Sequence, residues 1–319
     1  MPDSLPDLSE AVVICTRNRS GELKQTLRSV AAQSGAEGRL VLVVDGSDPD
    51  EVDATAQVVS AWTDELPFHY FRYSGAPAGT RQRNTGIDQL PRSVTIVHFL
   101  DDDVTLRPNY FHALSTALRQ HPRLLGVGGI ILDPDASSPT PPEITVPHKL
   151  FLLRTDAPSR VLASGQTTPA WPAHGRALQP AEWLSTCASS YRRNVFEHHR
   201  FDPAVEGPSP RLEDLDFSYR VAREGTLAVA PEAHCVHRFS STNRQEVSDS
   251  TCERVARRYW FVEKNLGSGP HRLAFWWSML GKFLILLVSS HPDRNEALHG
   301  FLRGIQTVWR RNHSLLRPE

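Results

Sequence analysis

Apolar runs alternate with segments of helical periodicity over the first 132 residues of the chain. The runs are rich in β-branched residues, which predicts strands, and they cover residues 11–15, 40–44, 68–73, 94–100 and 126–132. Helices are expected between them, at about residues 20–33 and 50–66, after Gly79, and from about Pro108. Strands that alternate with helices are typical of βα units, so this half predicts an α/β fold with a mostly parallel sheet.

The second half of the chain is less regular. Nine prolines lie between Asp133 and Pro180 and predict an irregular segment with one short helix at about residues 149–154. Beyond this segment we expect extended chain at 183–191, helices at 193–199, 213–224 and 246–266, and strands at 227–230 and 234–239.

A long apolar segment, residues 273–290, has Lys282 as its only charge and precedes a basic helix at about 296–311. Eighteen residues are near the lower limit for crossing a bilayer, and a central lysine adds about 2.5–3.5 kcal/mol to the cost of insertion, so a simple span is disfavoured. Three interpretations stay open: packing in the core or in a dimer, a helical hairpin in the membrane interface, and a span.

Charge is balanced overall, at −1 for 319 residues, but not along the chain. Residues 251–319 hold eleven Lys and Arg against five Asp and Glu, a net charge of +6, which leaves −7 for residues 1–250. The acidic body argues against nucleic-acid binding, whereas the basic tail fits an anionic membrane surface, an acidic partner or a solvated helix face. The four cysteines lack CxxC spacing and the first residues lack a signal-like apolar run, so we expect reduced thiols and a cytoplasmic protein.

Three consecutive carboxylates, Asp101, Asp102 and Asp103, follow the fourth apolar run. In open α/β sheets ligands bind beyond the carboxyl ends of the strands, which is where these side chains are expected. A divalent cation would relieve their mutual repulsion and could hold a diphosphate through its remaining coordination positions. The alternative is a solvated turn that caps the next helix.

Other polar groups follow neighbouring runs at the same predicted edge. Asp45 could accept hydrogen bonds from a nucleobase or ribose, and Thr16 and Arg17 follow the first strand where a base could be held. Arg81 and Arg83 lie at a helix start, where free backbone N–H groups and guanidinium groups favour phosphate. Helix capping and solubility are the alternative explanations of these residues.

Asp214 opens a predicted helix after a loop rich in proline and glycine. The helix dipole favours the anion, so we expect Asp214 to be ionised at neutral pH and able to accept a proton from an attacking alcohol. Complementing the helix dipole is a common structural alternative. His237 could ligate a divalent metal if it lies beside the aspartates.

These pieces together resemble the pattern of glycosyltransferase family 2, from about Ala11 to Phe239. The matching strings occur in order: VVICTRNR at 12–19, VVDGS at 43–47, GTRQRNTG at 79–86, FLDDDV at 99–104, ASSYRR at 188–193, and EDLDFSYR at 213–220. The resemblance implies a GT-A type, Rossmann-like, mostly parallel sheet flanked by helices, with a C-terminal helical extension that is apolar and basic. It also implies inverting sugar transfer from a nucleotide-diphosphosugar.

The resemblance assigns a role to each candidate residue. It implies that Thr16, Arg17, Asp45, Arg81, Arg83, Asp101 and Asp102 bind the donor nucleotide, that Asp101, Asp103 and His237 bind Mn²⁺ or Mg²⁺, that Asp214 is the general base, and that Glu213, Ser189 and Trp183 are accessory groups for the acceptor. The donor would be a UDP-, GDP- or dTDP-linked sugar. The acceptor would be a hydroxyl of a glycan or of a lipid-linked or other glycoconjugate, as in making a bacterial-type surface polysaccharide.

The expected organisation is a glycosyltransferase domain at 1–245 and a helical region at 246–319. The domain would consist of a nucleotide-binding half at 1–132 and an acceptor-binding half at 133–245. The helical region would serve peripheral membrane association through 273–311 or a homo-oligomer. The nearest string to the Gln-x-x-Arg-Trp motif of processive synthases, at 256–260, lacks the glutamine, which favours non-processive transfer. A sugar-phosphate nucleotidyltransferase and an inactive binding module are the alternatives.

Overall fold

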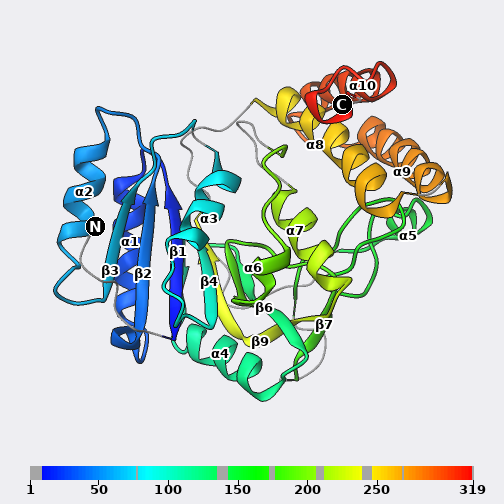
Figure 1. Ribbon diagram of the computed structural model, residues 1–319. Coiled ribbons are helices and arrows are strands. Elements are labelled where there is room, and N and C mark those ends of the chain that lie inside the picture. Colours follow the sequence, from blue (N-terminus) through cyan, green and yellow to red (C-terminus); the bar gives the residue numbers. More distant parts are fainter. Residues whose placement is uncertain are drawn as a thin grey trace.

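The protein is described here by a computed structural model that covers residues 9–76, 78–134, 143–171, 177–205, 212–238, 246–267 and 269–317. A single sheet of nine strands runs through the molecule, in the order β3-β2-β1-β4-β8-β6-β9-β5, with β7 paired to β9 (Figure 1). The strands are β1 (Glu10–Thr16), β2 (Arg39–Asp45), β3 (Phe68–Arg72), β4 (Ile96–Asp101), β5 (Val104–Leu106), β6 (Leu124–Leu132), β7 (Gln179–Ala181), β8 (Ala188–Arg192) and β9 (Thr226–His237).

Helices cover both faces of the sheet, and three more form the C-terminal region. They are α1 (Ser20–Ala31), α2 (Val52–Ser60), α3 (Gly79–Asp88), α4 (Tyr110–Gln120), α5 (Val146–Leu150), α6 (Val195–His198), α7 (Glu213–Ala222), α8 (Val247–Phe261), α9 (Gly269–Val288) and α10 (Arg294–Trp309). The predicted α/β class, with helices flanking the sheet and a helical C-terminal extension, is confirmed.

Strands β3, β2, β1 and β4 form the parallel block that the apolar runs predict. Both faces of the inner strand β2 are buried, because its Val41 and Val43 pack into one apolar cluster while its Leu40, Leu42 and Val44 pack into the other. A continuous apolar run is the expected signature of such a strand. Since parallel strands all end at one edge, the block gathers its carboxyl-terminal loops there.

Helix α3 lies against this block and brings its arginines to the same edge. Gly86 makes the close packing feasible, because a Cβ atom there would stand 2.7 Å from Cγ1 of Val13 and 3.2 Å from Cγ2 of Val44. Contacts under 3.0 Å would require the strands to shift. The tight α3 contact therefore fixes where the start of the helix, with Arg83, sits above the strand ends.

The second half departs from the expected elements in three places. The runs 227–230 and 234–239 form the single strand β9, which continues past Pro231 with an irregularity in its pairing to β6; Phe239 lies outside the described residues. Of the segment predicted to be extended at 183–191, only residues 188–191 belong to a strand, β8, which continues to Arg192. The short helix expected at 149–154 begins and ends earlier, as α5.

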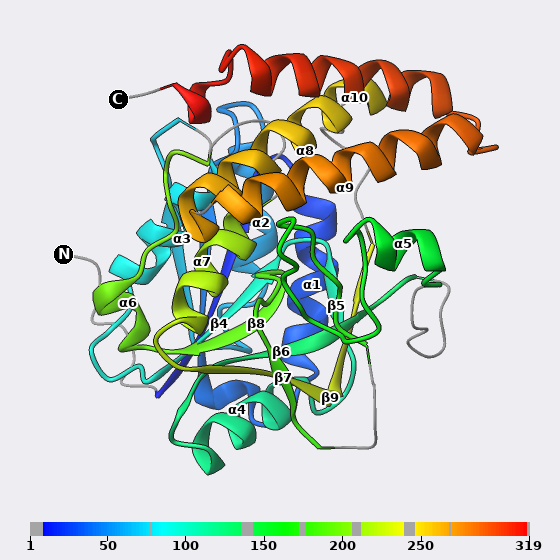
Figure 2. The ribbon, with the colours of Figure 1, turned by 90° about the vertical axis from the view of Figure 1, so that its right-hand side faces the viewer.

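The C-terminal helices pack on one another and on α7 at one end of the molecule (Figures 1 and 2). Two glycines of α10 allow it to approach α8 closely, since a Cβ at Gly300 would clash with the carbonyl oxygen of Ser248, and one at Gly304 would lie 2.7 Å from Cβ of Val255. The predicted helix at 246–266 is α helical to Phe261 and continues as a π-helical turn over Val262–Leu266. Helix α9 is long and apolar enough to cross a membrane, although length and composition alone are weak evidence of that.

Candidate active site

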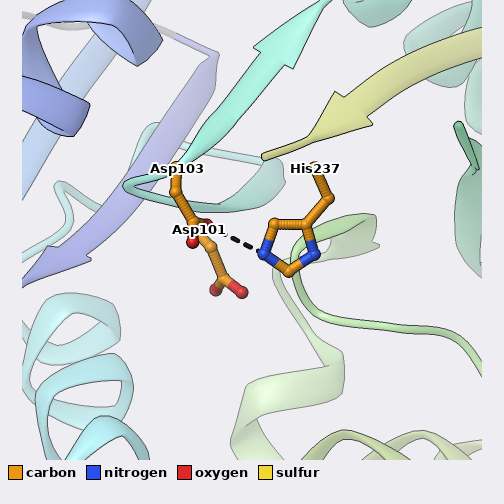
Figure 3. Close-up of side chains that lie close together, drawn as sticks. All are labelled: Asp101, Asp103 and His237. Carbon is orange, nitrogen blue, oxygen red and sulfur yellow. Dashed lines mark ion pairs between the residues drawn. The ribbon is translucent and has the colours of Figure 1, made fainter. Parts of the chain in front are cut away.

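The acidic turn at the end of β4, residues 101–103, lies against the end of β9. Strand β5 follows the turn directly and pairs antiparallel with β9, so that Val104 stands opposite His237. This register brings Nε2 of His237 to 2.9 Å from Oδ1 of Asp103, with Asp101 beside them (Figure 3). One ligand atom from each of Asp101, Asp103 and His237 can be chosen so that all three lie within 4.8 Å of one another.

These three side chains fit a divalent cation. Two carboxylates and an imidazole suit metals such as Mn²⁺, and three protein ligands leave coordination positions for other oxygens. Burial by itself would lower the pKa of His237, but the hydrogen bonds to Asp103 and Cys187 raise it to about 11. The imidazolium therefore supplies the positive charge that the carboxylates require in the metal-free protein.

The middle carboxylate of the turn points inward. Oδ2 of Asp102 accepts a hydrogen bond from Oγ1 of Thr16 at 2.7 Å, and its Oδ1 lies 3.1 Å from Nη1 of Arg19. Burial raises the pKa of Asp102 to about 7, although Arg19 opposes this shift. Thr16 and Asp102 are both buried and bonded to each other, so in this structure they hold the turn in place. Their expected contact with the donor nucleotide stays a prediction.

Asp45 is fully buried where β2 ends. Its carboxylate accepts hydrogen bonds from the backbone N–H of Ser47 at 2.8 Å and from the hydroxyl of Tyr70 at 2.6 Å, and Arg72 donates to its carbonyl oxygen at 3.0 Å. Sequence analysis gave Tyr70 and Arg72 no role. Arg72 follows the same rule that singled out Asp45, because it ends the adjacent parallel strand β3, whereas Tyr70 is the middle residue of that strand.

Arg17 lies in the loop after β1 and contacts the loop after β2. Its Nη2 lies 3.1 Å from Oδ1 of Asp48, and both side chains are more than 40% exposed. Asn18 makes two further hydrogen bonds with Asp48: its Nδ2 donates to Oδ2 of Asp48 at 2.6 Å, and its Oδ1 accepts from the backbone N–H of Asp48 at 2.8 Å. The two loops that sequence analysis grouped as donor-binding are thus held side by side.

Arg83 joins the cluster of Asp101, Asp103 and His237 to the start of α7. Its Nη2 donates to Oδ1 of Asp101 at 3.0 Å, and its Nη1 donates to Oε1 of Glu213 at 3.1 Å. The guanidinium also lies over the ring of Phe201, 5.6 Å from its centre. Arg81, two residues earlier on α3, is exposed. Both arginines were predicted to contact phosphate. Arg83 lies beside the acidic turn.

Asp214 stands next to Glu213 in the first turn of α7. Burial raises its pKa to about 7, with the charge of Glu213 adding to the rise, while its hydrogen bond from the Leu215 N–H and the charge of Arg83 oppose it. The prediction of full ionisation at neutral pH is therefore wrong for the metal-free protein. The loss of water around this partly buried carboxylate outweighs the helix dipole on which the sequence prediction rested.

Ser189 and Trp183, the two remaining candidates for acceptor binding, contact other parts of the protein itself. Ser189 is buried in β8 opposite Phe99, and Trp183 donates from Nε1 to the carbonyl oxygen of Thr168 at 2.9 Å. Their place on the acceptor side stays a prediction. Arg19 and Cys187 touch the acidic turn and His237, although sequence analysis gave neither a role. Arg19 belongs to the string after β1, whereas no sequence signal pointed to Cys187.

Comparison with known proteins agrees with this arrangement. The sequence model of Glycosyl transferase family 2 matches residues 11–171, half of the chain, and the chain belongs to this family. It is thus a glycosyltransferase, which decides against the nucleotidyltransferase alternative. A stretch of 131 residues is 30% identical to the glucosyl-dolichyl phosphate glucuronosyltransferase of Haloferax volcanii, and the match covers 38% of this chain and 38% of that relative.

Solved glycosyltransferase structures share the fold at low sequence identity. The crystal structure of residues 1–349 of S. aureus TarS has a TM-score of 0.56 at 13% identity, over 93% of this chain and 81% of that one. The mannosyltransferase PcManGT from Pyrobaculum calidifontis, in complex with GDP-Man and Mn²⁺, has a TM-score of 0.60 at 12% identity, over 96% and 88% of the two chains. The expected GT-A fold is confirmed.

We predict that Arg83→Met destabilises the protein by about 3–5 kcal/mol, because the change leaves Asp101 and Glu213 without their shared cation in a site where Arg83 is only 10% exposed. Chemical denaturation measures this difference. Arg303→Met is the control, since its pair with Asp249 is about half exposed and should contribute about 0–1 kcal/mol. Equal losses in the two variants would contradict the bridging role of Arg83.

Proposed function

We propose that this glycosyltransferase moves a sugar from a nucleotide-diphosphosugar to an acceptor hydroxyl, with inversion at the anomeric carbon and with a divalent metal. The observation that carries the proposal is the junction made by Arg83, which places the Asp101, Asp103 and His237 cluster next to Asp214. The complex of PcManGT with GDP-Man and Mn²⁺ supports the donor class and the metal, because that protein shares the fold.

In this mechanism the residues on one side of Arg83 act on the leaving diphosphate, and Asp214 on its other side acts on the acceptor hydroxyl. Asp101, Asp103 and His237 hold the metal, which would supply positive charge to the departing diphosphate. Arg83 adds a fixed cation at the same place. Asp214 takes the proton of the acceptor hydroxyl as its oxygen bonds to the anomeric carbon and the bond from that carbon to the diphosphate breaks. Asp45, with Tyr70 and Arg72, would lie toward the nucleoside.

The donor and its metal should be detectable by thermal stability. A ligand at 100 times its dissociation constant adds about 2.7 kcal/mol, so one of the UDP, GDP or dTDP sugars should raise the melting temperature in the presence of Mn²⁺ or Mg²⁺. Asp103→Ala should lose the metal-dependent part of this rise. Asp156→Ala, at an exposed carboxylate, should keep it. No metal-dependent rise with any nucleotide-sugar would refute the proposed donor site.

Asp214→Asn should lower transfer by roughly a hundredfold to ten-thousandfold while donor binding persists, because only proton removal is lost. A base with a pKa of about 7 accepts protons only when deprotonated, so the wild-type rate should fall as pH drops below 7 and level off above it. Asp216→Asn is the comparison, since this buried residue of the same helix binds Arg220 at 2.9 Å and should lose stability instead of chemistry. A pH profile that stays flat between 5 and 8 would remove Asp214 from this role.

We also propose that α9 attaches the protein to the cytoplasmic face of a membrane. Leu273, Trp277, Leu280, Leu284 and Leu287 recur every three or four residues and are 43–72% exposed, so they form one apolar stripe along the outer side of the helix. Residues 251–319, which include α9, carry a net charge of +6, and this charge complements an anionic lipid surface. An acidic or neutral rim would have favoured a protein partner instead.

Binding to vesicles tests this attachment. The protein should co-sediment with vesicles that contain phosphatidylglycerol, more weakly as salt rises, because the electrostatic part is screened. Leu280→Gln combined with Leu284→Gln should reduce the bound fraction several-fold, whereas Arg17→Gln, which removes an exposed charge in the loop after β1, should not. If the double variant binds as well as the wild type, the stripe does not contact lipid, and a concentration-dependent dimer would then explain its exposure.

A further inference from the structure

Helix α5 lies on the surface and exposes apolar side chains. All five of its residues are at least partly exposed, and Val146 and Leu150 are 78% and 59% exposed. These two residues are four positions apart, so they share one side of the helix. Exposed apolar side chains that gather in one place mark contact with another molecule or with a membrane.

The C-terminal end of α5 is joined to α9. Nε1 of Trp277 donates to the carbonyl oxygen of Leu150 at 2.8 Å. The next residue, Phe151, places its ring 5.0 Å from that of Trp277, measured between the ring centres. Phe151 also packs on Gly281, where a Cβ atom would clash with its side chain. Figure 1 shows α5 beside α9, and these contacts join the two helices directly.

This junction makes the exposed side of α5 continuous with the apolar stripe of α9. Trp277 belongs to the stripe, is 43% exposed, and contacts α5 at Leu150. A stripe on one helix would leave the protein free to rotate about the axis of that helix on a flat surface. A second contact beside the helix removes this freedom, so the two elements together define one orientation.

The junction also pairs two polar groups that border the apolar surface. The carbonyl oxygen of Leu150 is among the last four of α5, which have no partner within a helix. The indole N–H of Trp277 likewise needs a partner where water is excluded. Because the two groups bond to each other, this part of the surface can meet hydrocarbon, which offers no hydrogen bonds, without leaving either group unpaired.

Positive charge favours an anionic bilayer as the partner of this surface. Residues 143–154 carry a net charge of +1, and α9 carries +2 with no acidic residue in its sequence. A second copy of the chain that used the same surface, as in a two-fold dimer, would bring these like charges together. Anionic lipid headgroups would instead attract them.

We propose that α5 and α9 form a single membrane-binding surface whose partner is an anionic lipid bilayer. This inference rests on the proposed function, because it adds a second contact to the attachment proposed for α9. The new contact comes from another part of the chain, more than a hundred residues before α9. The bilayer therefore touches the second half of the catalytic domain as well as the C-terminal helices, and it holds the protein in one orientation.

Vesicle binding by matched variants tests the contribution of α5. The full-length protein, Leu150→Gln and Leu302→Gln are co-sedimented with vesicles that contain phosphatidylglycerol. The two leucines are 59% and 51% exposed, and Leu302 lies on α10, outside the proposed surface. Leu150→Gln should weaken binding by about fivefold to tenfold, because its side chain no longer moves from water into hydrocarbon. Leu302→Gln should bind as the wild type does.

A second variant keeps the junction with Trp277 in place. Val146→Gln changes the most exposed apolar residue of α5, one turn before the junction, and should weaken binding in the same direction. Equal losses in Leu150→Gln and Leu302→Gln would overturn the proposal. So would wild-type binding by both Val146→Gln and Leu150→Gln.

Amide hydrogen exchange locates the contact without any substitution. Addition of the same vesicles should slow exchange at residues 146–152 and along α9. Exchange in α2, at the other end of the molecule in Figure 1, should not change. Slower exchange in α9 with no change at 146–152 would mean that α9 binds alone, and would overturn the proposal.

These experiments separate the inference from the attachment on which it rests. If Leu280→Gln with Leu284→Gln reduces vesicle binding while Val146→Gln and Leu150→Gln do not, the attachment by α9 stands and only the role of α5 is wrong. If no variant changes binding and α9 gains no protection from exchange, the attachment itself is refuted. The metal-dependent thermal shift by nucleotide-sugars tests the donor site independently of both.

Discussion

The ion pairs of Arg83 are the constraint on which the site depends. One guanidinium holds a carboxylate from the end of β4 and another from the start of α7, residues that are 112 positions apart in the chain. A nearly buried cation between two anions is stable only when both partners are in place. The pairing therefore ties the geometry of the Asp101, Asp103 and His237 cluster to that of the start of α7, where Asp214 lies.

The parallel half of the fold could be predicted because its strands are buried on both faces. A strand such as β2 must then be apolar at every position, and this leaves a clear signal in the sequence. Strand β9 gives no such signal, because Pro231 interrupts its run. The structure accommodates the interruption by an irregular register against β6, and this tertiary adjustment is not encoded in local periodicity.

The individual residues of the candidate site could be predicted from the sequence, but the contacts between them could not. The rule that functional side chains follow parallel strands singled out Asp45 and Asp101 as candidates. Asp214 was a candidate because it opens a predicted helix, and His237 was one on the condition that it lies beside the aspartates; the resemblance then gave these residues their expected roles. No local pattern shows that Arg83 reaches Glu213, or that Asp102 turns inward to Thr16. The protonation of Asp214 also escaped prediction, since it depends on how much water the folded protein excludes around the carboxylate.

The short ladder between β5 and β9 limits how this chain can change length during evolution. His237 faces Asp103 only because Val104, Thr105 and Leu106 pair with His237, Val236 and Cys235. Successive side chains of a strand point to opposite faces, so an insertion or deletion of one residue within 235–237 would turn the imidazole to the other side of the sheet. Length variation among related proteins should thus avoid this ladder, while substitutions that keep its register remain acceptable.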